Sequence, residues 1–214
     1  VLHGDRATPD YRDPDVVVLQ ERGREHEAAY LESLRAAGLG IVDLRANGDA
    51  DAVAQTLTAM QDGADIIAQA GLQCGSWFGR ADMLKKVDRP STLGGWSYEV
   101  VDCKLARETK AGTILQLALY PDLLGAAQGL LPEFMHVVMP GEGFVTESHR
   151  VLDFGAYYRF VRAQLEGCVA QPPGTLGTYP DRMGECDVCR WWQECDQTRR
   201  RDDHLSLVAG ISQV

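Results

Sequence analysis

The sequence predicts a mixed α/β fold, in which a sheet is flanked by helices and followed by a small C-terminal cysteine-rich segment. Two observations predict it. Helical spacing of apolar residues alternates with short β-rich runs along the first 170 residues, and three of the six cysteines fall close together near the end. Of the 214 residues, 45% are hydrophobic and 24% are charged. Such a chain can bury a core, so disorder, collagen and coiled coil are excluded as descriptions of the whole.

Prolines, glycines and the spacing of apolar residues predict the first elements. Residues 1–20 contain two prolines and are predicted to form an irregular lead-in. Residues 21–37 are predicted to form an amphipathic helix, because apolar side chains recur at helical spacing and two glycines follow. A short apolar run over 41–44 predicts a strand. Residues 49–61 predict a second helix with one apolar side.

A block of strands comes next, followed by a second alternation of helices and strands. A glycine turn and a loop rich in Pro, Ser and Gly separate the first three strands, and two glycines separate the last two. The final helix has Asp153 as its expected N-cap. The predicted elements are strands over 65–72, 77–87 and 96–104, a helix over 110–124, strands over 134–139 and 144–151, and a helix over 153–169.

The composition also predicts how the chain is divided. Residues 171–180 contain three prolines and two glycines, which indicates a boundary. We therefore expect a core over 21–170 and a linker with the cysteine-rich segment over 171–203. Residues 204–214 are expected to begin a further region.

The net charge of −10 argues against a protein that coats nucleic acid non-specifically. It does not argue against DNA chemistry, because a metal-dependent phosphodiesterase needs clustered acids that divalent ions offset. The sequence contains no apolar run long enough to span a membrane and no signal-peptide pattern at Val1–Pro14. We therefore expect a cytoplasmic protein with reduced cysteines and no membrane partner.

The predicted strand that ends in Asp102-Cys103-Lys104 contains the residues best suited to catalysis. Because side chains alternate along a strand, Asp102 and Lys104 share a face and Cys103 points to the other. The carboxylate can bind a hard divalent cation, and the ammonium can orient an attacking water or stabilise charge on a phosphate. For this pair alone, a surface ion pair is the alternative.

Asp82 lies on the preceding predicted strand among apolar residues, where an acid is costly unless it is paired or bound to metal. Asp82 and Asp102 on adjacent strands are therefore predicted to share one Mg²⁺ or Mn²⁺. A salt bridge from Asp82 to a nearby Arg or Lys is the alternative interpretation.

Two helices supply the remaining candidates. His26 lies four residues before Tyr30 on the inward face of the first predicted helix, where a neutral imidazole can be a third metal ligand or a half-buried structural histidine. Gln116 and Tyr120 are spaced i, i+4, so one helical face would carry both. Such a polar stripe can position DNA beside a metal site, or it can belong to an ordinary amphipathic helix.

In this order along the chain, these motifs resemble the RecB-like branch of the PD-(D/E)XK nuclease superfamily over residues 21–200. The resemblance implies a restriction-endonuclease-like core that cleaves DNA with Mg²⁺ or Mn²⁺, usually as an exonuclease acting with helicase machinery. It implies that the metal ligands are His26, Asp82, Asp102 and the carbonyl of Cys103. It also implies that Lys104 is catalytic and that Asp82, Asp102, Gln116 and Tyr120 belong to the catalytic site.

The cysteine segment has the pattern C-x2-C-x5-C, formed by Cys186, Cys189 and Cys195. Thiolates at this spacing bind zinc or an iron–sulfur cluster, and His204 is a candidate fourth ligand for zinc. The segment resembles the carboxy-terminal part of the iron–sulfur staple in RecB-like nucleases of the Cas4 and AddB types. That resemblance implies a 4Fe–4S cluster whose upstream cysteine is expected to lie before residue 1, since no cysteine precedes Cys74.

The sequence therefore predicts a metal-dependent DNA nuclease. It is expected to be an exonuclease domain that acts on single-stranded DNA or DNA ends, within a larger protein with a helicase or RNase H-like region. The alternative is a non-catalytic DNA-binding or assembly module with a structural zinc site. Elemental analysis for iron or zinc distinguishes the two possible occupants of the cysteine segment.

Overall fold

The computed structural model describes residues 14–106, 108–141, 143–172, 175 and 179–208. The chain divides into two compact units. The first unit, Arg22–Val161, contains the sheet. The second consists of the described parts of Val1–Glu21 and Arg162–Val214. No helix in the described part of the chain combines the length and the apolar character that a membrane span requires.

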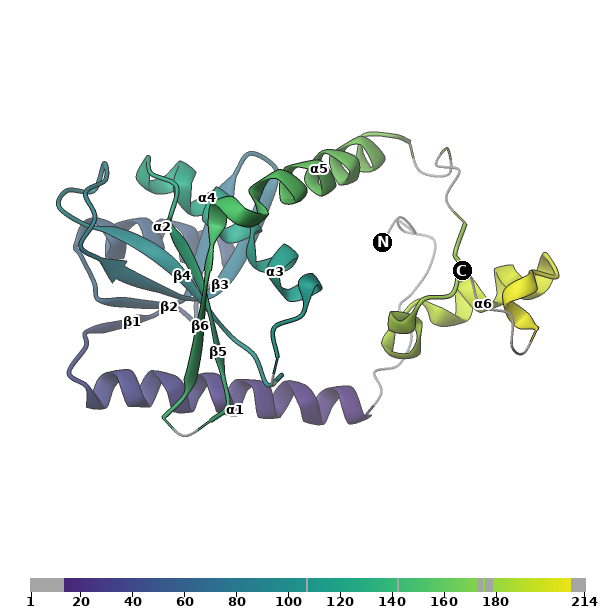
Figure 1. The fold of residues 1–214 in the computed structure, drawn as a ribbon, viewed down its shortest axis with the longest axis horizontal. Coiled ribbons are helices and arrows are strands. Elements are labelled where there is room, and N and C mark those ends of the chain that lie inside the picture. Colours follow the sequence, from purple (N-terminus) through teal and green to yellow (C-terminus); the bar gives the residue numbers. More distant parts are fainter. Residues whose placement is uncertain (1–13, 107, 142, 173–174, 176–178, 209–214) are drawn as a thin grey trace. The chain divides into compact units, whose positions relative to one another are not determined.

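The first unit is built on one six-stranded mixed sheet, in which the strands lie in chain order (Figure 1). The pairs β1–β2 and β4–β5 are parallel, and the other three pairs are antiparallel. Each parallel pair is joined by a helical crossover, as parallel strands require. The strands are β1 Ile41–Asp43, β2 Ile66–Cys74, β3 Trp77–Val87, β4 Ser97–Cys103, β5 Phe134–Met139 and β6 Val145–Arg150.

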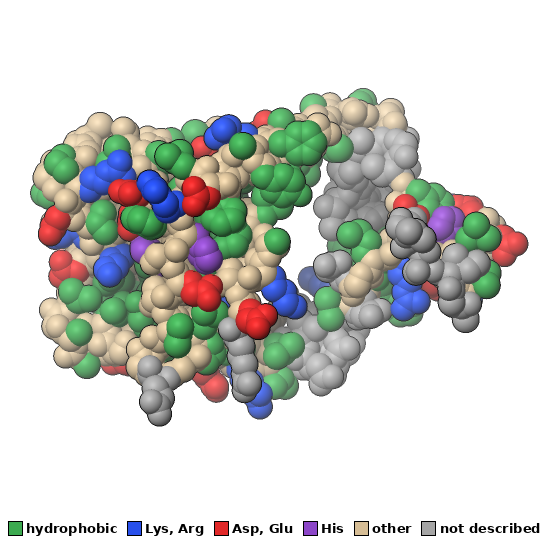
Figure 2. Space-filling model, viewed as in Figure 1, with side chains coloured by type: hydrophobic (Ala, Val, Ile, Leu, Met, Phe, Trp, Pro, Cys, Tyr) green, Lys and Arg blue, Asp and Glu red, His purple; other side chains and the backbone are tan. Residues whose placement is uncertain are grey.

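Helices cover both faces of this sheet, which confirms the predicted α/β class. On one face, Leu31 of α1 packs with sheet residues such as Ile66 and Val101. On the other face, Met60 of α2 and Leu124 of α4 contribute to the larger core cluster. The helices are α1 Pro14–Ala36, α2 Asp49–Gln61, α3 Ala111–Leu117, α4 Leu119–Gln128 and α5 Val151–Val169. Figure 2 shows acidic and basic side chains interspersed on the visible face of this unit.

The helix α1 begins earlier than predicted. It starts at Pro14, so the predicted irregular lead-in over 1–20 is wrong for 14–20. Proline suits a first helical turn, because its fixed φ matches the helix and its missing N–H would have no intrahelical partner there. Val17, Val18 and Leu19 in this first part of the helix are all exposed. They therefore lack the apolar face, packed against a core, that the sequence analysis used to recognise helices. The remainder of the lead-in, 1–13, lies outside the described residues.

The helix predicted over 110–124 is two helices, α3 and α4, which are separated at Ala118. Pro121 explains the break. Proline has no N–H to donate to the carbonyl four residues earlier, which is that of Leu117, and it is tolerated in the first turn of a new helix. The sequence argument followed the apolar spacing across this proline and therefore missed the interruption.

The second unit contains short elements. After the end of α5, the chain forms the 3-10 helix η2 Gly184–Val188, the helix α6 Trp192–Arg201 and the 3-10 helix η3 Leu205–Leu207. The predicted further region over 204–214 is described only as far as residue 208.

Candidate metal centre

The candidate site lies where β3 and β4 separate. Their backbone ladder runs from Val87–Ser97 to Met83–Val101, and β4 continues beside β5 as far as Cys103. Asp82 and Asp102 follow the last ladder pair, so they lie opposite each other at the point of separation. Oδ2 of Asp82 accepts a hydrogen bond of 2.8 Å from the Cys103 N–H. A side chain therefore replaces the backbone partner that a continued ladder would supply.

A break in the pleat of the neighbouring strands accounts for this separation. Gln69 in β2 has a φ of 53°, which is uncommon for any residue other than glycine. The β2–β3 pairing passes from Ala68–Met83 to Ala70–Ala81 without pairing Gln69 to Asp82. Ala68 and Met83 face the α1 side, whereas Ala70 and Ala81 belong to the opposite core cluster. Residues two apart normally share a face, so both strands turn over at this point.

Burial raises the pKa values of both carboxyl groups. Asp102 is only 6% exposed. Burial, followed by the negative charge of Asp82, raises the pKa of Asp102 to about 6, although Lys104 opposes the shift. Burial also raises the pKa of Asp82, although the Cys103 N–H and the charge of Lys104 oppose the shift. The pair therefore retains protons at higher pH than ordinary aspartates do.

Lys104 lies directly beside this pair. Its Nζ is 2.9 Å from Oδ2 of Asp102, as expected for two residues on one strand face. The geometry is that of an ion pair rather than a well-aligned hydrogen bond, and Oδ2 is buried without a hydrogen-bond donor in the described part of the chain. The Lys104 side chain is 31% exposed, so the ammonium reaches solvent next to a buried, under-satisfied carboxylate.

Tyr120 approaches the site from α4. Its hydroxyl donates a hydrogen bond of 2.8 Å to the carbonyl of Arg80, and its ring passes so close to Gly79 that a Cβ there would lie 2.8 Å from the ring. Burial, followed by the charges of Asp102 and Asp82, raises the pKa of Tyr120 to about 12. Tyr120 is therefore a neutral phenol near both carboxylates.

Gln116 is placed differently from its predicted partner. It lies exposed on α3, and the break at Ala118 puts Tyr120 on a separate helix. The predicted stripe of Gln116 and Tyr120 on a single continuous helix is therefore wrong. Among the described contacts, only Tyr120 of the two is linked to the carboxylate pair.

His26 lies beside the backbone of the site. Its Nε2 is 3.1 Å from the carbonyl oxygen of Val138, which also accepts a hydrogen bond of 2.9 Å from the Lys104 N–H. The ring packs against Phe144 with a centroid distance of 5.6 Å. The structure thus brings His26 near Lys104 but engages its Nε2 with a carbonyl, and its role as a metal ligand stays a prediction.

Glu27 is a site residue that the sequence argument missed. Its buried carboxylate accepts hydrogen bonds from Gln69 at 2.9 Å and from Arg45 at 3.2 Å. Burial raises the pKa of Glu27, and the charge of Asp82 contributes to the shift. A signal was present, because Glu27 precedes Leu31 by four residues and so places an acid on the apolar face of α1.

The donor set fits a divalent cation in charge, although it is not already arranged around one. Within the described residues, no group of three His, Cys, Asp or Glu side chains is positioned to hold a metal. Asp82 and Asp102 nevertheless place a half-buried and a buried carboxylate together, and Oδ2 of Asp102 has no hydrogen-bond donor among the described residues. Burial is the largest cause of their raised pKa values, and it exceeds the opposing effect of the Lys104 charge. The carbonyl of Cys103 stays a predicted ligand.

The three C-terminal cysteines are gathered by local turns. The Met183 N–H donates to Cys186 Sγ at 3.3 Å, and the Trp191 N–H donates to Cys189 Sγ at 3.5 Å. Burial raises the pKa of Cys195; Arg199 lowers it, and the nearby Cys189 and Cys186 raise it further. Backbone hydrogen bonds to sulfur are a feature that tunes iron–sulfur ligation.

His204 is engaged away from the thiols. It stacks on Tyr179 at 4.6 Å, and its Nδ1 is 2.9 Å from the Ser206 hydroxyl. Its Nε2 is 3.7 Å from Asp181. These contacts do not support His204 as the fourth ligand of a zinc site.

The chain matches no known protein-family profile and no curated protein. The functional argument therefore rests on the geometry of these side chains.

Proposed function

We propose that this chain is a metal-dependent DNA nuclease with a RecB-like PD-(D/E)XK core. One observation carries the proposal: Asp82 in β3, Asp102 in β4 and Lys104 directly after β4 lie close together where the two strands separate. The mixed sheet with helices on both faces supports the fold assignment at the level of architecture. Buried, perturbed carboxylates grouped in this way are typical of functional sites, because they cost stability unless they are used.

Asp82 and Asp102 are the residues that would hold Mg²⁺ or Mn²⁺, and Glu27 lies close enough to influence Asp82 electrostatically. When bound, the ion would supply positive charge beside the scissile phosphate and acidify a coordinated water. Carboxylate oxygens are the ligands that these hard cations prefer.

The other side chains have roles that follow from their positions. The exposed end of Lys104 can donate hydrogen bonds to an attacking water or to a phosphate oxygen, where it stabilises negative charge. Tyr120 is a positioning residue, because its hydroxyl holds the backbone of Arg80, two residues before Asp82. Cys103 is not a nucleophile in this scheme, since burial raises the pKa of its thiol well above its usual range.

The C-terminal thiols are proposed to hold a 4Fe–4S cluster, with its fourth ligand outside the described residues. The two N–H donors to sulfur support this assignment, although the three described cysteine side chains are not already arranged around a common ion. Zinc is the alternative occupant. Iron and sulfide in the purified protein, with the brown colour of a cluster, would distinguish the two.

A cleavage assay tests the proposed nuclease. The protein should degrade linear DNA with Mg²⁺ or Mn²⁺ and not with EDTA, and Asp102→Asn or Lys104→Ala should each lower the rate by at least about 10³-fold. Lys85→Ala is the matched control, because it removes an exposed lysine from β3 within the ladder opposite Glu99. Full activity in both site variants would refute the nuclease. DNA binding without cleavage would favour the non-catalytic module.

A further inference from the structure

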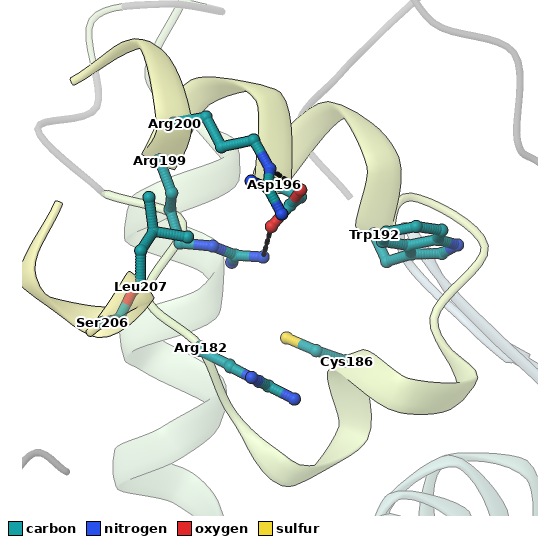
Figure 3. A pocket seen from close by; sticks show the side chains of 8 residues that line it. All are labelled: Arg182, Cys186, Trp192, Asp196, Arg199, Arg200, Ser206 and Leu207. Atoms are coloured by element: carbon teal, nitrogen blue, oxygen red, sulfur yellow. Dashed lines mark hydrogen bonds and ion pairs between the residues drawn. The ribbon is translucent and has the colours of Figure 1, made fainter. Parts of the chain in front are cut away.

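A pocket of about 400 Å³ lies in the C-terminal unit, apart from the carboxylate site in the sequence (Figure 3). Arg199, Arg200, Asp196 and Trp192 reach it from α6, and Arg182 and Cys186 line it from the segment before that helix. Figure 3 shows Arg182 and Cys186 facing Arg199 across the opening. None of the predicted functions uses these arginines.

The lining of this pocket is positively charged, in contrast to the chain as a whole. Three arginines line it, and Asp196 is its one acidic residue among the described lining, whereas the net charge of the protein is −10. Asp196 accepts a hydrogen bond of 2.6 Å from Nε of Arg200. That bond, together with the nearby guanidinium charges, lowers the pKa of Asp196. Arg199 and Arg200 share the single carboxylate of Asp196, so guanidinium charge exceeds carboxylate charge among these three residues and favours an anion.

Arg199 makes this a built site rather than a chance cluster on the surface. The residue is only 4% exposed, and its Nη1 donates a hydrogen bond of 2.8 Å to the carbonyl of Pro180. Its Nη2 is 3.7 Å from Asp196. A guanidinium whose two terminal nitrogens both have fixed partners loses little further side-chain entropy when an anion binds.

Trp192 adds an aromatic surface next to these cations. It lines the pocket at the first turn of α6 and is 45% exposed. Guanidinium groups bind phosphate through several parallel hydrogen bonds, and an exposed indole stacks on a nucleobase. Arginines and a half-exposed tryptophan around one opening therefore match the two halves of a nucleotide.

The pocket shares one residue with the proposed thiol site. Cys186 lines it, whereas Cys189 and Cys195 are not among its lining residues.

We propose that this pocket binds a phosphate of single-stranded DNA, with the adjoining base stacked on Trp192. The inference rests on the proposed function for the choice of DNA, but it assigns a second contact for that partner. The arginines would act as charge-assisted donors and take no part in cleavage.

Fluorescence anisotropy of a labelled, 5′-phosphorylated single-stranded oligonucleotide, without added Mg²⁺ or Mn²⁺ and without a chelator, tests the proposal on the whole chain. Arg182→Gln and Arg200→Gln should each weaken binding at least about fivefold and lower the salt dependence by about 0.7 in log–log slope. Trp192→Ala should weaken it about tenfold. Arg201→Gln is the matched control, because this neighbouring arginine is paired with Asp202 and does not line the pocket; it should change binding less than about twofold. Arg199 is left intact because it is buried.

The outcomes separate this inference from the nuclease proposal. Equal effects of Arg200→Gln and Arg201→Gln, or no binding by the unaltered protein, would overturn the pocket. Equal competition by inorganic phosphate and by deoxyadenosine monophosphate would reduce it to a simple anion site and overturn the role of Trp192. Metal-dependent cleavage with unchanged binding in the pocket variants would refute the inference alone. Pocket-dependent binding without cleavage would refute the nuclease alone.

Discussion

The two units of the chain differ in the surroundings of their buried charged groups. In the sheet unit, Asp102 and Glu27 lie within a structure whose apolar side chains are buried on both faces of a sheet. In the C-terminal unit, Arg199 is the one buried side chain among the described residues after position 161. A segment with so little apolar core needs another source of order, such as a metal or disulfides. The comparison teaches that a buried apolar core holds the first site, whereas little buried apolar surface supports the second.

Metal removal should break this comparison most strongly. Under the proposed thiol ligation, removing the metal, or changing Cys186→Ser, should unfold the C-terminal unit and leave the sheet unit intact, because metal binding supplies folding free energy of about 10 kcal/mol in small metal-dependent segments. Limited proteolysis with mass spectrometry should then detect new cleavage sites after residue 170 only. Cys74→Ser, at an exposed position at the end of β2, is the control. Unchanged protection in metal-free protein would show that this unit is stable without a metal.

A substitution at Gln128 should destabilise the sheet unit rather than the C-terminal unit. Gln128 is fully buried; its Oε1 accepts the Tyr98 N–H at 2.8 Å, and its Nε2 donates to Leu130 at 2.9 Å. Gln128→Ala should lower the free energy of unfolding of the sheet unit by about 2–4 kcal/mol, because it leaves buried backbone groups unpaired. Chemical denaturation measures the loss, with the exposed Gln61→Ala as control. Equal losses in both variants would argue that this buried network contributes nothing.

The carboxylate pair predicts a pH dependence that belongs to the sheet unit. The pKa of Asp102 is raised in the fold, so the folded state binds more protons than the unfolded state. Stability of the metal-free protein should therefore fall by about 2 kcal/mol as pH rises from about 4 to about 6, and then level off. Mn²⁺ should restore stability above pH 6, since it replaces the proton.

Thermal unfolding between pH 4 and 8, with and without Mn²⁺, measures this effect. Asp102→Asn should flatten the pH profile and remove most of the Mn²⁺ response. A Mn²⁺ response that survives in Asp102→Asn would place the metal elsewhere.

The smallest expected effect concerns the contact of Tyr120 with β3. Gly79→Ala should destabilise the sheet unit by about 1–2 kcal/mol and displace Tyr120, because the added Cβ would lie 2.8 Å from its ring. Gly112→Ala is the matched control: it lies in α3 with open space around it and should be neutral or stabilising by up to about 1 kcal/mol. Circular dichroism melts of both variants test the pair, and equal stability would show that Tyr120 adapts freely.

The local patterns of the sequence were sufficient for much of the sheet unit. Period-two runs and glycine turns indicated all six strands, and alternation along β4 placed Lys104 beside Asp102. They were insufficient where one residue overrides a pattern. Pro121 splits a helix whose apolar spacing continues across it, so Gln116 and Tyr120 were wrongly assigned to one continuous helix. Glu27 was overlooked because its partner Gln69 lies on a strand 42 residues away.

The sequence by itself determined the identity and order of the elements, because periodicity, turns and breakers act over a few neighbouring residues. Only the tertiary structure decided which charges meet: the turnover of β2 and β3 at Gln69 and Asp82, the shared burial of two carboxylates, and the arginine pocket beside Trp192. The physical reason is that burial and Coulomb interactions depend on distance in space, and that distance is set by packing between segments that no local pattern relates.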